Sequence, residues 1–318
     1  MMVTTGLMKM TKGIAAITGA SGLVGSKIKQ KLLQQGYEVR VLTRSKSFRD
    51  DHAQVYYGDL GNTDVLRLFL KNVAYVFHCA AELIDEARMW EVNVLGTERL
   101  LKFAGESGAS YFCHLSSVGV VGKTGSAWVD EETPCNPQNA YERSKWAAEE
   151  LVAKGIGNCN IAILRPTLVV DEQRLGALTL PIRSNWRNRF IVFLKGSECA
   201  HIVHAEDVAN AALYFMHSHF EKPECFIVST DHEPLNTYAE LWSLCQAIRK
   251  GDQQARIKSV LHLPVIVPHI LRLLRRGKSN RGDTRYSSKK LMGHNFVFAL
   301  GIKGAIQQVI EFGKTGKR

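Results

Sequence analysis

The stretch GIAAITGASGLVGSKIKQKLLQQG, residues 13–36, decides the fold of this chain. It opens with a short apolar run that contains β-branched isoleucines, which predicts a buried strand. Residues 23–35 then have the spacing of an amphipathic helix, and a glycine follows as a helix terminator. Three glycines spaced three residues apart join the two parts, so the backbone can turn tightly where the helix starts. The segment therefore predicts a strand, a glycine-rich turn and a helix.

The alternation of short apolar runs and longer amphipathic runs continues to about residue 170. Further strands are expected at 37–42, 55–58, 73–79, 111–116 and 161–164, and helices at 64–71, 89–105 and 141–154. Near-continuous apolar strands separated by helices are typical of a parallel sheet with helices on both faces. The predicted fold class is α/β, a Rossmann-type doubly wound parallel sheet with a smaller, interleaved C-terminal substrate-binding region.

The pattern changes after residue 170. Residues 171–196 look irregular and are rich in arginine, and the strand and helix signals then resume at 201–204, 205–217, 224–229 and 235–249. We expect a dinucleotide-binding domain over 12–170, to which 200–230 returns, and a mainly substrate-binding region over 171–318. Residues 1–11 are expected to form a flexible leader.

The composition excludes several classes of protein. The chain has 41 basic and 30 acidic residues in 318, a formal charge of +11, which suits phosphates or an anionic surface, although a solvated basic face would give the same balance. No nucleic-acid-binding motif accompanies this charge. Seven scattered cysteines without a CxxC pair argue for reduced thiols and against a metal site. With no signal peptide or long apolar run, we expect a cytoplasmic protein.

The turn after the first strand is predicted to hold the pyrophosphate of a dinucleotide. Small residues let the backbone approach the phosphates, while the start of the helix offers free N–H groups and a positive dipole end. A strand before the turn and a helix after it make this signal stronger than a lone glycine triplet, whose alternative is a turn without a ligand. The residues concerned are Gly19, Ala20, Ser21, Gly22, Leu23, Val24 and Gly25.

The end of the second strand indicates which dinucleotide is bound. An acidic side chain there would accept the ribose hydroxyls of NAD, but Thr43 takes this place and Arg44 follows. A guanidinium suits a 2′-phosphate, so NADP(H) is preferred over NAD(H), unless Arg44 only stacks on adenine or points to water. Asp59 either hydrogen-bonds the adenine amino group or is a turn residue.

A phenol and an ammonium group lie four residues apart in Tyr141 and Lys145, which places them on one face of a helix. A neighbouring Lys⁺ favours the phenolate, so Tyr141 is predicted to exchange a proton with an alcohol or carbonyl oxygen. Ser117, at the end of the fifth strand, is predicted to hydrogen-bond the same oxygen. The spacing is common on helices, and its place after the serine and the glycine turn makes it specific.

Together these residues resemble the extended short-chain dehydrogenase/reductases, the NAD-dependent epimerase/dehydratase family. The likeness is carried in order by Gly19, Gly22 and Gly25; Asp59-Leu60; His78-Cys79-Ala80-Ala81; Asn93-Val94-x-Gly96-Thr97; Ser116-Ser117; Tyr141-x-x-x-Lys145; Arg165-Pro166; His204-x-x-Asp207-Val208-Ala209; and, near the end, residues 286–292 with Leu300-Gly301-Ile302.

The resemblance implies roles for individual residues. Ser117, Tyr141 and Lys145 would be catalytic, with Lys145 also holding the nicotinamide ribose. The cofactor would further contact Leu60, Ala80, Ala81 and Pro166. Asn93 would support the sheet and the active-site helix, or would simply cap a helix. By family analogy the chain would form a homodimer.

Departures from the family pattern bear on the substrate. Val118-Gly119 stands where dehydratases of the family carry an acidic pair, which argues against dehydration. Ala200 takes the place of an arginine that binds the nucleotide of the substrate in epimerases, although an arginine at 183, 187 or 189 would be able to replace it. The leading prediction is still an NAD(P)-dependent oxidoreductase or epimerase that acts on a nucleotide-linked sugar through Tyr141.

The C-terminal third supports other interpretations. Residues 261–274, LHLPVIVPHILRLL, are apolar, and 272–290 hold eight basic residues against one acid, Asp283. In the related 3-beta-hydroxysteroid dehydrogenases and dihydroflavonol reductases this region is a substrate lid, so a hydrophobic ketone is the alternative substrate. Peripheral membrane contact through 261–290 is possible but not favoured, and a buried helix pair with a solvated loop is simpler. Pro264 and Pro268 argue against a long regular helix. A further alternative is a non-catalytic NAD(P)-binding sensor.

Overall fold

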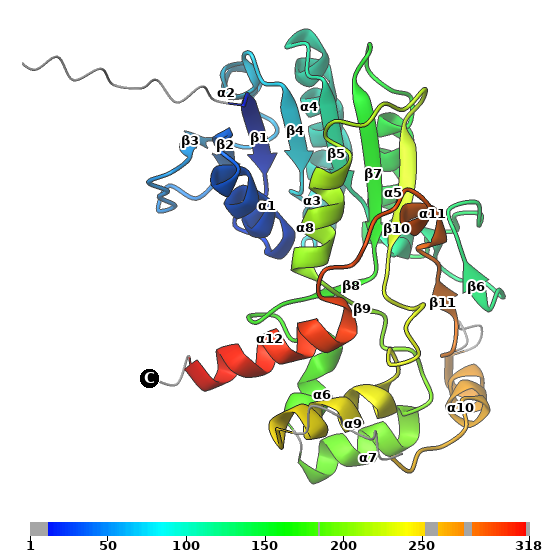
Figure 1. The fold of residues 1–318 in the computed structure, drawn as a ribbon. Helices are drawn as coiled ribbons and strands as arrows, with labels where there is room; N and C mark the ends of the chain where they lie inside the picture. The colour runs from blue at the N-terminus through cyan, green and yellow to red at the C-terminus, as the bar shows by residue number, and fades with distance from the viewer. Residues whose placement is uncertain (1–11, 184, 252–259, 277–281, 316–318) are drawn as a thin grey trace, which may run out of the picture.

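A single parallel sheet forms the centre of the molecule (Figure 1). The computed structural model describes residues 12–183, 185–251, 260–276 and 282–315. Its seven main strands lie in the order β10-β7-β5-β4-β1-β2-β3 and all pair in parallel. They are β1 (Ile14–Thr18), β2 (Glu38–Thr43), β3 (Gln54–Tyr57), β4 (Tyr75–His78), β5 (Tyr111–Leu115), β7 (Asn160–Pro166) and β10 (Glu224–Val228). The predicted doubly wound α/β fold is confirmed.

Helices cover both faces of this sheet because successive side chains of a buried strand point to opposite sides. In β1, Ala15 and Ile17 join the core beneath α1 (Leu23–Gln34) and α8 (Ala205–Tyr214), while Ala16 joins the core on the other face. That second face is covered by α2 (Thr63–Leu70), α4 (Gly96–Glu106) and α5 (Ala140–Val152). Because helices bury both faces of the sheet, the strands appear in the sequence as continuous apolar runs.

A smaller layer lies beyond the carboxyl ends of the strands (Figure 1). Two short parallel pairs belong to it, β8 (Leu168–Val170) with β9 (Ile202–His204), and β6 (Trp128–Val129) with β11 (Arg285–Tyr286). Its helices are α6 (Thr179–Ile182), α7 (Trp186–Lys195), α9 (Tyr238–Arg249), α10 (Ile266–Arg276) and α12 (Gly301–Thr315). A third apolar cluster, in which Ile202, Leu241 and Ile306 are fully buried, holds α9 and α12 against β9.

Two short elements complete the chain trace: α3 (Glu86–Met89) leads into a π-helical turn over Trp90–Leu95, and α11 (Lys289–Gly293) follows β11. The helix expected at 89–105 therefore starts earlier and is interrupted by the wider turn. No helix in the described part of the chain is both long and apolar enough to span a bilayer. The leader expected at 1–11 lies outside the described residues.

One expectation about the C-terminal half is wrong. Residues 171–196 are not irregular throughout, because α7 forms there and Asn185 caps it by accepting a hydrogen bond from the Asn188 N–H. The prolines argue against a long regular helix after residue 261, and α10 is a short helix that begins at Ile266. Pro268 lies in the first turn of α10, where a missing N–H costs nothing.

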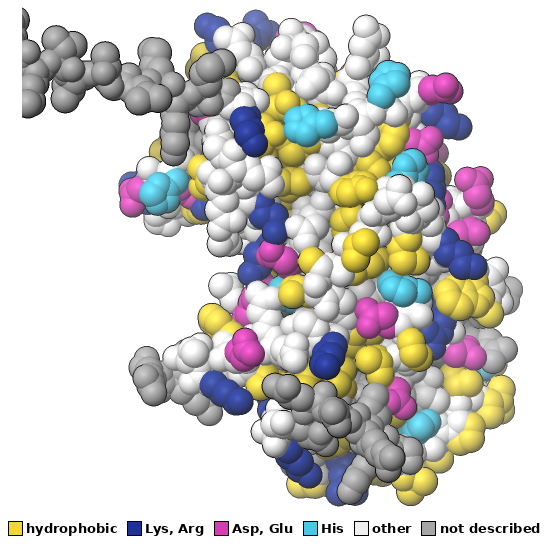
Figure 2. Space-filling view, viewed as in Figure 1, with side chains coloured by type: hydrophobic (Ala, Val, Ile, Leu, Met, Phe, Trp, Pro, Cys, Tyr) yellow, Lys and Arg dark blue, Asp and Glu magenta, His cyan; other side chains and the backbone are white. Residues whose placement is uncertain are grey.

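The simplest interpretation of residues 261–290 predicted a buried helix pair. The helix α10 is not buried. Figure 2 shows hydrophobic side chains at the lower right edge of the molecule, where α10 lies in Figure 1. Ile266, Ile270, Leu271 and Leu274 all remain exposed. Its apolar residues therefore contribute little to the core.

Candidate active site

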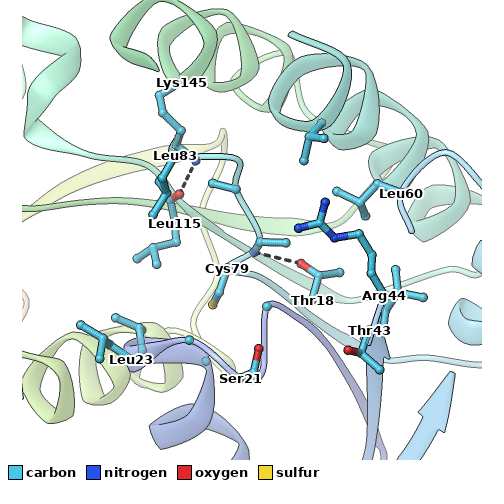
Figure 3. Close-up of a pocket in the computed structure, with 18 of the residues that line it drawn as sticks. Thr18, Ser21, Leu23, Thr43, Arg44, Leu60, Cys79, Leu83, Leu115 and Lys145 are labelled. Carbon is cyan, nitrogen blue, oxygen red and sulfur yellow. Dashed lines mark hydrogen bonds between the residues drawn. The ribbon is translucent and has the colours of Figure 1, made fainter. Parts of the chain in front are cut away.

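A cleft of about 730 Å³ lies at the carboxyl ends of β1, β2, β4 and β5. In a parallel sheet these ends meet at one edge, and ligands bind there where the strand order reverses. Residues predicted from sequence come together in this cleft, as the close-up in Figure 3 illustrates. Those that line it are Gly19, Ser21, Gly22, Leu23, Val24, Gly25, Arg44, Asp59, Leu60, Ala80, Ala81, Ser117, Tyr141, Lys145 and Pro166. Ala20 differs, because its side chain turns into the apolar core.

The glycine turn is shaped by close backbone packing. Gly19 has φ +73°, and a Cβ atom there would lie 2.6 Å from the backbone nitrogen of Ala80. A Cβ atom on Gly25 would lie 2.3 Å from the Gly19 carbonyl oxygen. Both positions therefore require glycine, since a side chain would push the turn away from β4 or open the start of α1.

The start of α1 suits an anionic ligand. Its N-cap is Gly22, which offers no side chain to bind the first N–H groups, and its first turn contains no acidic residue. The positive end of the helix therefore faces the cleft without a competing carboxylate. Together with the narrow space above Gly19, this geometry fits the pyrophosphate of a dinucleotide.

The far end of the cleft is formed by the ends of β2 and β3. Thr43 ends β2, as expected, and the Arg44 side chain that follows extends into the cleft in Figure 3. One Arg44 nitrogen lies 3.9 Å from a carboxylate oxygen of Glu82. The Asp59 carboxylate accepts a hydrogen bond of 2.9 Å from the Gly61 N–H in this turn and also lines the cleft, so a contact with the adenine amino group stays a prediction.

A buried polar chain joins the glycine turn to α4. The hydroxyl of Thr97 donates to the Asn93 carbonyl at 2.6 Å, so the His78 Nε2–H must donate to Thr97, 2.8 Å away. His78 Nδ1 then accepts from the Thr18 hydroxyl at 2.7 Å, and that oxygen accepts from the Ala80 N–H. Burial lowers the pKa of His78 to about 3, with the charge of Lys145 adding to the effect. A neutral imidazole thus holds the floor of the cleft together.

Asn93 bridges two walls of the cleft. It lies inside the π-helical turn, and its side chain exchanges two hydrogen bonds with the backbone of Glu82, of 2.7 and 3.0 Å. The same amide donates to the Ser144 hydroxyl at 2.9 Å, on the helix that carries Tyr141. Asn93 therefore does not cap a helix. It supports the active-site helix, the alternative that the family resemblance implied.

Ser117 and Tyr141 face each other across the cleft. Ser117 follows β5 and its oxygen accepts from the Gly119 N–H at 3.1 Å. Burial raises the pKa of Tyr141, and a hydrogen bond to Ser117 offsets this only in part. Desolvation is the larger effect on the pKa of Tyr141 in the chain alone, and the role of the neighbouring ammonium group in favouring phenolate stays a prediction.

Lys145 lies deeper than its helical spacing alone suggested. Its Nζ donates to the Leu115 carbonyl at 2.6 Å (Figure 3), and burial lowers its pKa to about 8. One turn further along α5, Glu149 partly opposes this shift. Glu149 itself pairs with Arg165 at 2.5 Å and accepts from the Ser116 hydroxyl at 2.6 Å, which fastens α5 to β7 and β5.

Some residues around the cleft differ from the sequence expectations. Ala200 is buried and leaves no charged group at its position. The arginines at 183, 187 and 189 are exposed and are not among the described residues that line the cleft. Lining residues that the sequence did not single out include Leu83, Arg88, Glu91, Thr167 and Arg174. The sequence could have indicated these residues only by their position, since each follows a strand end or a motif by a few residues.

Comparisons with known proteins agree with this architecture. The NAD dependent epimerase/dehydratase family matches residues 15–228. A UDP-glucose 4-epimerase of Vibrio cholerae is 34% identical over 178 residues, 52% of this chain and 54% of that protein. A 3 beta-hydroxysteroid dehydrogenase/Delta 5-->4-isomerase of Mycobacterium tuberculosis is 32% identical over 172 residues, 49% of this chain and 46% of that protein. The chain thus spans about half the length of these curated relatives.

Solved structures show the same fold over nearly the whole chain. A UDP-glucose 4-epimerase of Thermotoga maritima, determined with UDP-glucose, has a TM-score of 0.71 at 20% identity and covers 96% of this chain and 100% of its own. A short-chain dehydrogenase/reductase superfamily protein of Agrobacterium tumefaciens with bound NAD has a TM-score of 0.72 at 21% identity, with the same coverage. At such identity the likeness concerns the fold. The family match, which spans more than half of the 318 residues, shows more: the chain belongs to the NAD-dependent epimerase/dehydratase family of extended short-chain dehydrogenase/reductases.

Proposed function

We propose that the chain is an NAD(P)-dependent oxidoreductase or epimerase in which Tyr141 exchanges a proton with the substrate oxygen. The observation that carries this proposal is the convergence of Ser117, Tyr141 and Lys145 at the cleft that the glycine turn opens. When bound, the dinucleotide would accept or return a hydride. A sensor without turnover would have no need of this arrangement.

The residues of the chain divide the remaining work. Ser117 and Tyr141 hydrogen-bond each other, so both hydroxyls point to one place, where a substrate oxygen would replace their mutual contact. Tyr141 donates a proton to that oxygen when a carbonyl is reduced and takes it back when an alcohol is oxidised. Lys145 binds the Leu115 carbonyl, and its charge, one helical turn along α5 from Tyr141, is proposed to lower the cost of forming phenolate.

Replacing one hydroxyl tests the role of Tyr141. We expect Tyr141→Phe to lower turnover by about 10²- to 10⁴-fold without changing the fold. Tyr214→Phe is the matched control, because Tyr214 is exposed and bonds the His294 carbonyl, far from the predicted chemistry. A Tyr141→Phe protein that retains full turnover would contradict the proposal.

The cofactor is proposed to be NADP(H), because Arg44 extends into the cleft where a ribose 2′-phosphate would lie. The nearby Glu82 carboxylate orients the guanidinium at 3.9 Å without a direct hydrogen bond. We expect Arg44→Leu to reduce the preference for NADPH over NADH by at least about tenfold. Arg49→Leu, which removes a charge from the same loop where Arg49 packs over Tyr57, should leave that preference unchanged.

The substrate is proposed to be a nucleotide-linked sugar, which the epimerase relatives support. The Arg174 side chain in the cleft offers a cation that such an anionic substrate would need. Thermal stabilisation by UDP- or dTDP-sugars, followed by interconversion of their epimers, would support this substrate class. A lack of any thermal shift with these compounds would exclude it.

A specific observation favours a second candidate, the reduction of a hydrophobic ketone. Ala200 is buried and uncharged at the position where epimerases of the family bind the nucleotide. The steroid dehydrogenase relative supports this reading. Oxidation of NADPH by a panel of steroid and flavonoid ketones, with no response to nucleotide sugars, would select this candidate. The two outcomes distinguish the substrates without affecting the role of Tyr141.

A further inference from the structure

An exposed apolar face runs along α10 and the residues just before it. Leu261 is 80% exposed and Leu274 is 81% exposed, and Ile266, Ile270 and Leu271 lie between them with about half of each side chain exposed. On a helix, positions 266, 270 and 274 follow one another at intervals of four, so they form a continuous stripe. Soluble proteins seldom leave such a stripe uncovered without a function for it.

Helix α7 also exposes large aromatic side chains. Trp186 is 76% exposed and Phe190, one turn later, is 57% exposed. The end of α7 is joined to the segment just before α10, because the Leu263 N–H donates to the Phe193 carbonyl at 2.8 Å and the Ser197 hydroxyl donates to the Leu263 carbonyl at 2.8 Å. We name this region the α7–α10 surface. It comprises Trp186, Phe190, Leu261, Ile266, Ile270, Leu271 and Leu274.

The two chain segments that carry the α7–α10 surface are rich in cations. No acidic residue occurs between Glu172 and Glu198 or between Asp252 and Asp283 in the sequence. The exposed cations on the first of these segments include Arg183, Arg187, Arg189 and Lys195. The Arg187 guanidinium lies over the Trp186 ring, 5.4 Å from its centre. Within the described part of the chain, the largely buried Glu198 pairs with Arg272 of α10.

We propose that the α7–α10 surface binds an anionic lipid membrane. A short amphipathic helix with exposed leucines and isoleucines, on segments rich in cations and together with an exposed tryptophan on α7, has the chemistry of a helix that lies in the interface of a bilayer. At 11 residues, α10 is about 16 Å long, which is too short to cross a membrane and suits a position in its plane. Nucleic acid would use the cations but would leave the aliphatic stripe exposed.

The proposed membrane surface is separate from the chemistry. Of the described residues that line the cleft, none belongs to α7 or α10. The protein would therefore be held at a membrane with its cleft still accessible, and binding to lipid does not depend on the proposed reaction. Membrane binding and turnover are independent measurements, so either result can fail alone.

The test is co-sedimentation of the full chain with vesicles. We expect binding to vesicles of phosphatidylcholine with about 30% phosphatidylglycerol, weaker binding to phosphatidylcholine alone, and loss of most binding at about 1 M salt. Trp186 should show a blue-shifted emission on binding, and Trp186→Phe should remove that shift. Absence of binding to both kinds of vesicle, or equal binding to both, would overturn the proposal.

Introducing negative charge on the α7–α10 surface provides the sharper variant. We expect Leu271→Glu combined with Leu274→Glu to weaken binding to anionic vesicles by at least about tenfold, because both apolar contact and charge attraction are lost. Leu68→Glu is the matched control, since Leu68 is 60% exposed on α2 on a different face. Equal loss in both proteins would overturn the proposal, as would a stable dimer in solution that is disrupted by the double variant, because a second copy would then cover the stripe.

Discussion

The cofactor cleft and the α7–α10 surface are built in opposite ways. In the cleft, buried polar groups such as His78, Thr97 and Asn93 are satisfied by one another, and glycines let backbones touch. At the α7–α10 surface, large apolar side chains such as Trp186 and Leu274 point into solvent. Internal contacts fix the shape of the cleft, whereas the α7–α10 surface is proposed to contact a membrane. Substitutions should therefore change the free energy of unfolding in the cleft and leave it nearly unchanged at the surface.

The largest effect is expected at Gly19. Gly19→Ala places a Cβ atom 2.6 Å from the Ala80 nitrogen at φ +73°, so we expect a loss of about 3 kcal/mol or more in the free energy of unfolding and at least about 100-fold weaker cofactor binding. Gly36→Ala is the control, because φ is +86° there with nothing within 4 Å of the added atom, and should cost about 1–2 kcal/mol. Urea denaturation and cofactor titration measure both. Equal losses would mean that close packing against Ala80 is not what requires glycine.

A second effect concerns Lys145, whose charge is buried at a cost. Its pKa is about 8 in the folded chain against an ordinary 10.5, so the folded state binds its proton less well than the unfolded state does. The group therefore destabilises the fold below about pH 8, and this cost disappears as the pH rises to about 10.5. Lys145→Met should raise the free energy of unfolding at pH 7 by up to about 3 kcal/mol, with no gain near pH 11, while turnover falls.

Denaturation of the two proteins at pH 7 and pH 11 checks the prediction for Lys145. Lys154→Met, at an exposed position just after the same helix, should give no pH-dependent gain. A gain of the same size at both pH values would show that the methionine acts by packing and not by removing a buried charge.

A smaller effect is expected at Asn93, which joins the loop at Glu82 to Ser144 on α5. Asn93→Ala should lower the free energy of unfolding by about 2 kcal/mol, because buried partners lose their hydrogen bonds, and should also lower turnover as α5 loosens. Asn62→Ala removes only the N-cap of α2 and should cost about 1 kcal/mol with unchanged turnover. Unfolding curves and steady-state kinetics separate the two. Unchanged turnover in Asn93→Ala would restrict Asn93 to a structural role.

Sequence reasoning worked where a local rule determines three-dimensional position. The parallel sheet could be predicted from its apolar strands, and Ser117, Tyr141 and the glycine turn could be expected at one edge, because carboxyl ends of parallel strands meet there. The bridging role of Asn93 depends on a π-helical turn, which no periodicity reveals. The raised pKa of Tyr141 depends on how tightly its surroundings exclude water.

The helix α7 is an element that sequence reasoning missed. Its aromatic residues Trp186 and Phe190 face outward, so the segment lacks the buried stripe by which an amphipathic helix is recognised. Arg44 and Ala200 show a third case. The sequence indicates a positive charge at residue 44 and the lack of one at residue 200, but which ligand binds depends on contacts that form only in a complex.

The smallest effect is expected at Leu274 and gives the most direct measure of the contrast between the two regions. Leu274→Ala should change the free energy of unfolding by less than about 0.5 kcal/mol, because 81% of the side chain is already in solvent. Leu32→Ala makes the same chemical change at a fully buried position in the core beneath α1 and should cost about 2–5 kcal/mol. Urea denaturation of both variants at several protein concentrations measures these changes in the free energy of unfolding. A cost above 2 kcal/mol at Leu274 that grows with protein concentration would mean that another copy of the chain covers the stripe, and the membrane proposal would then lose its free surface.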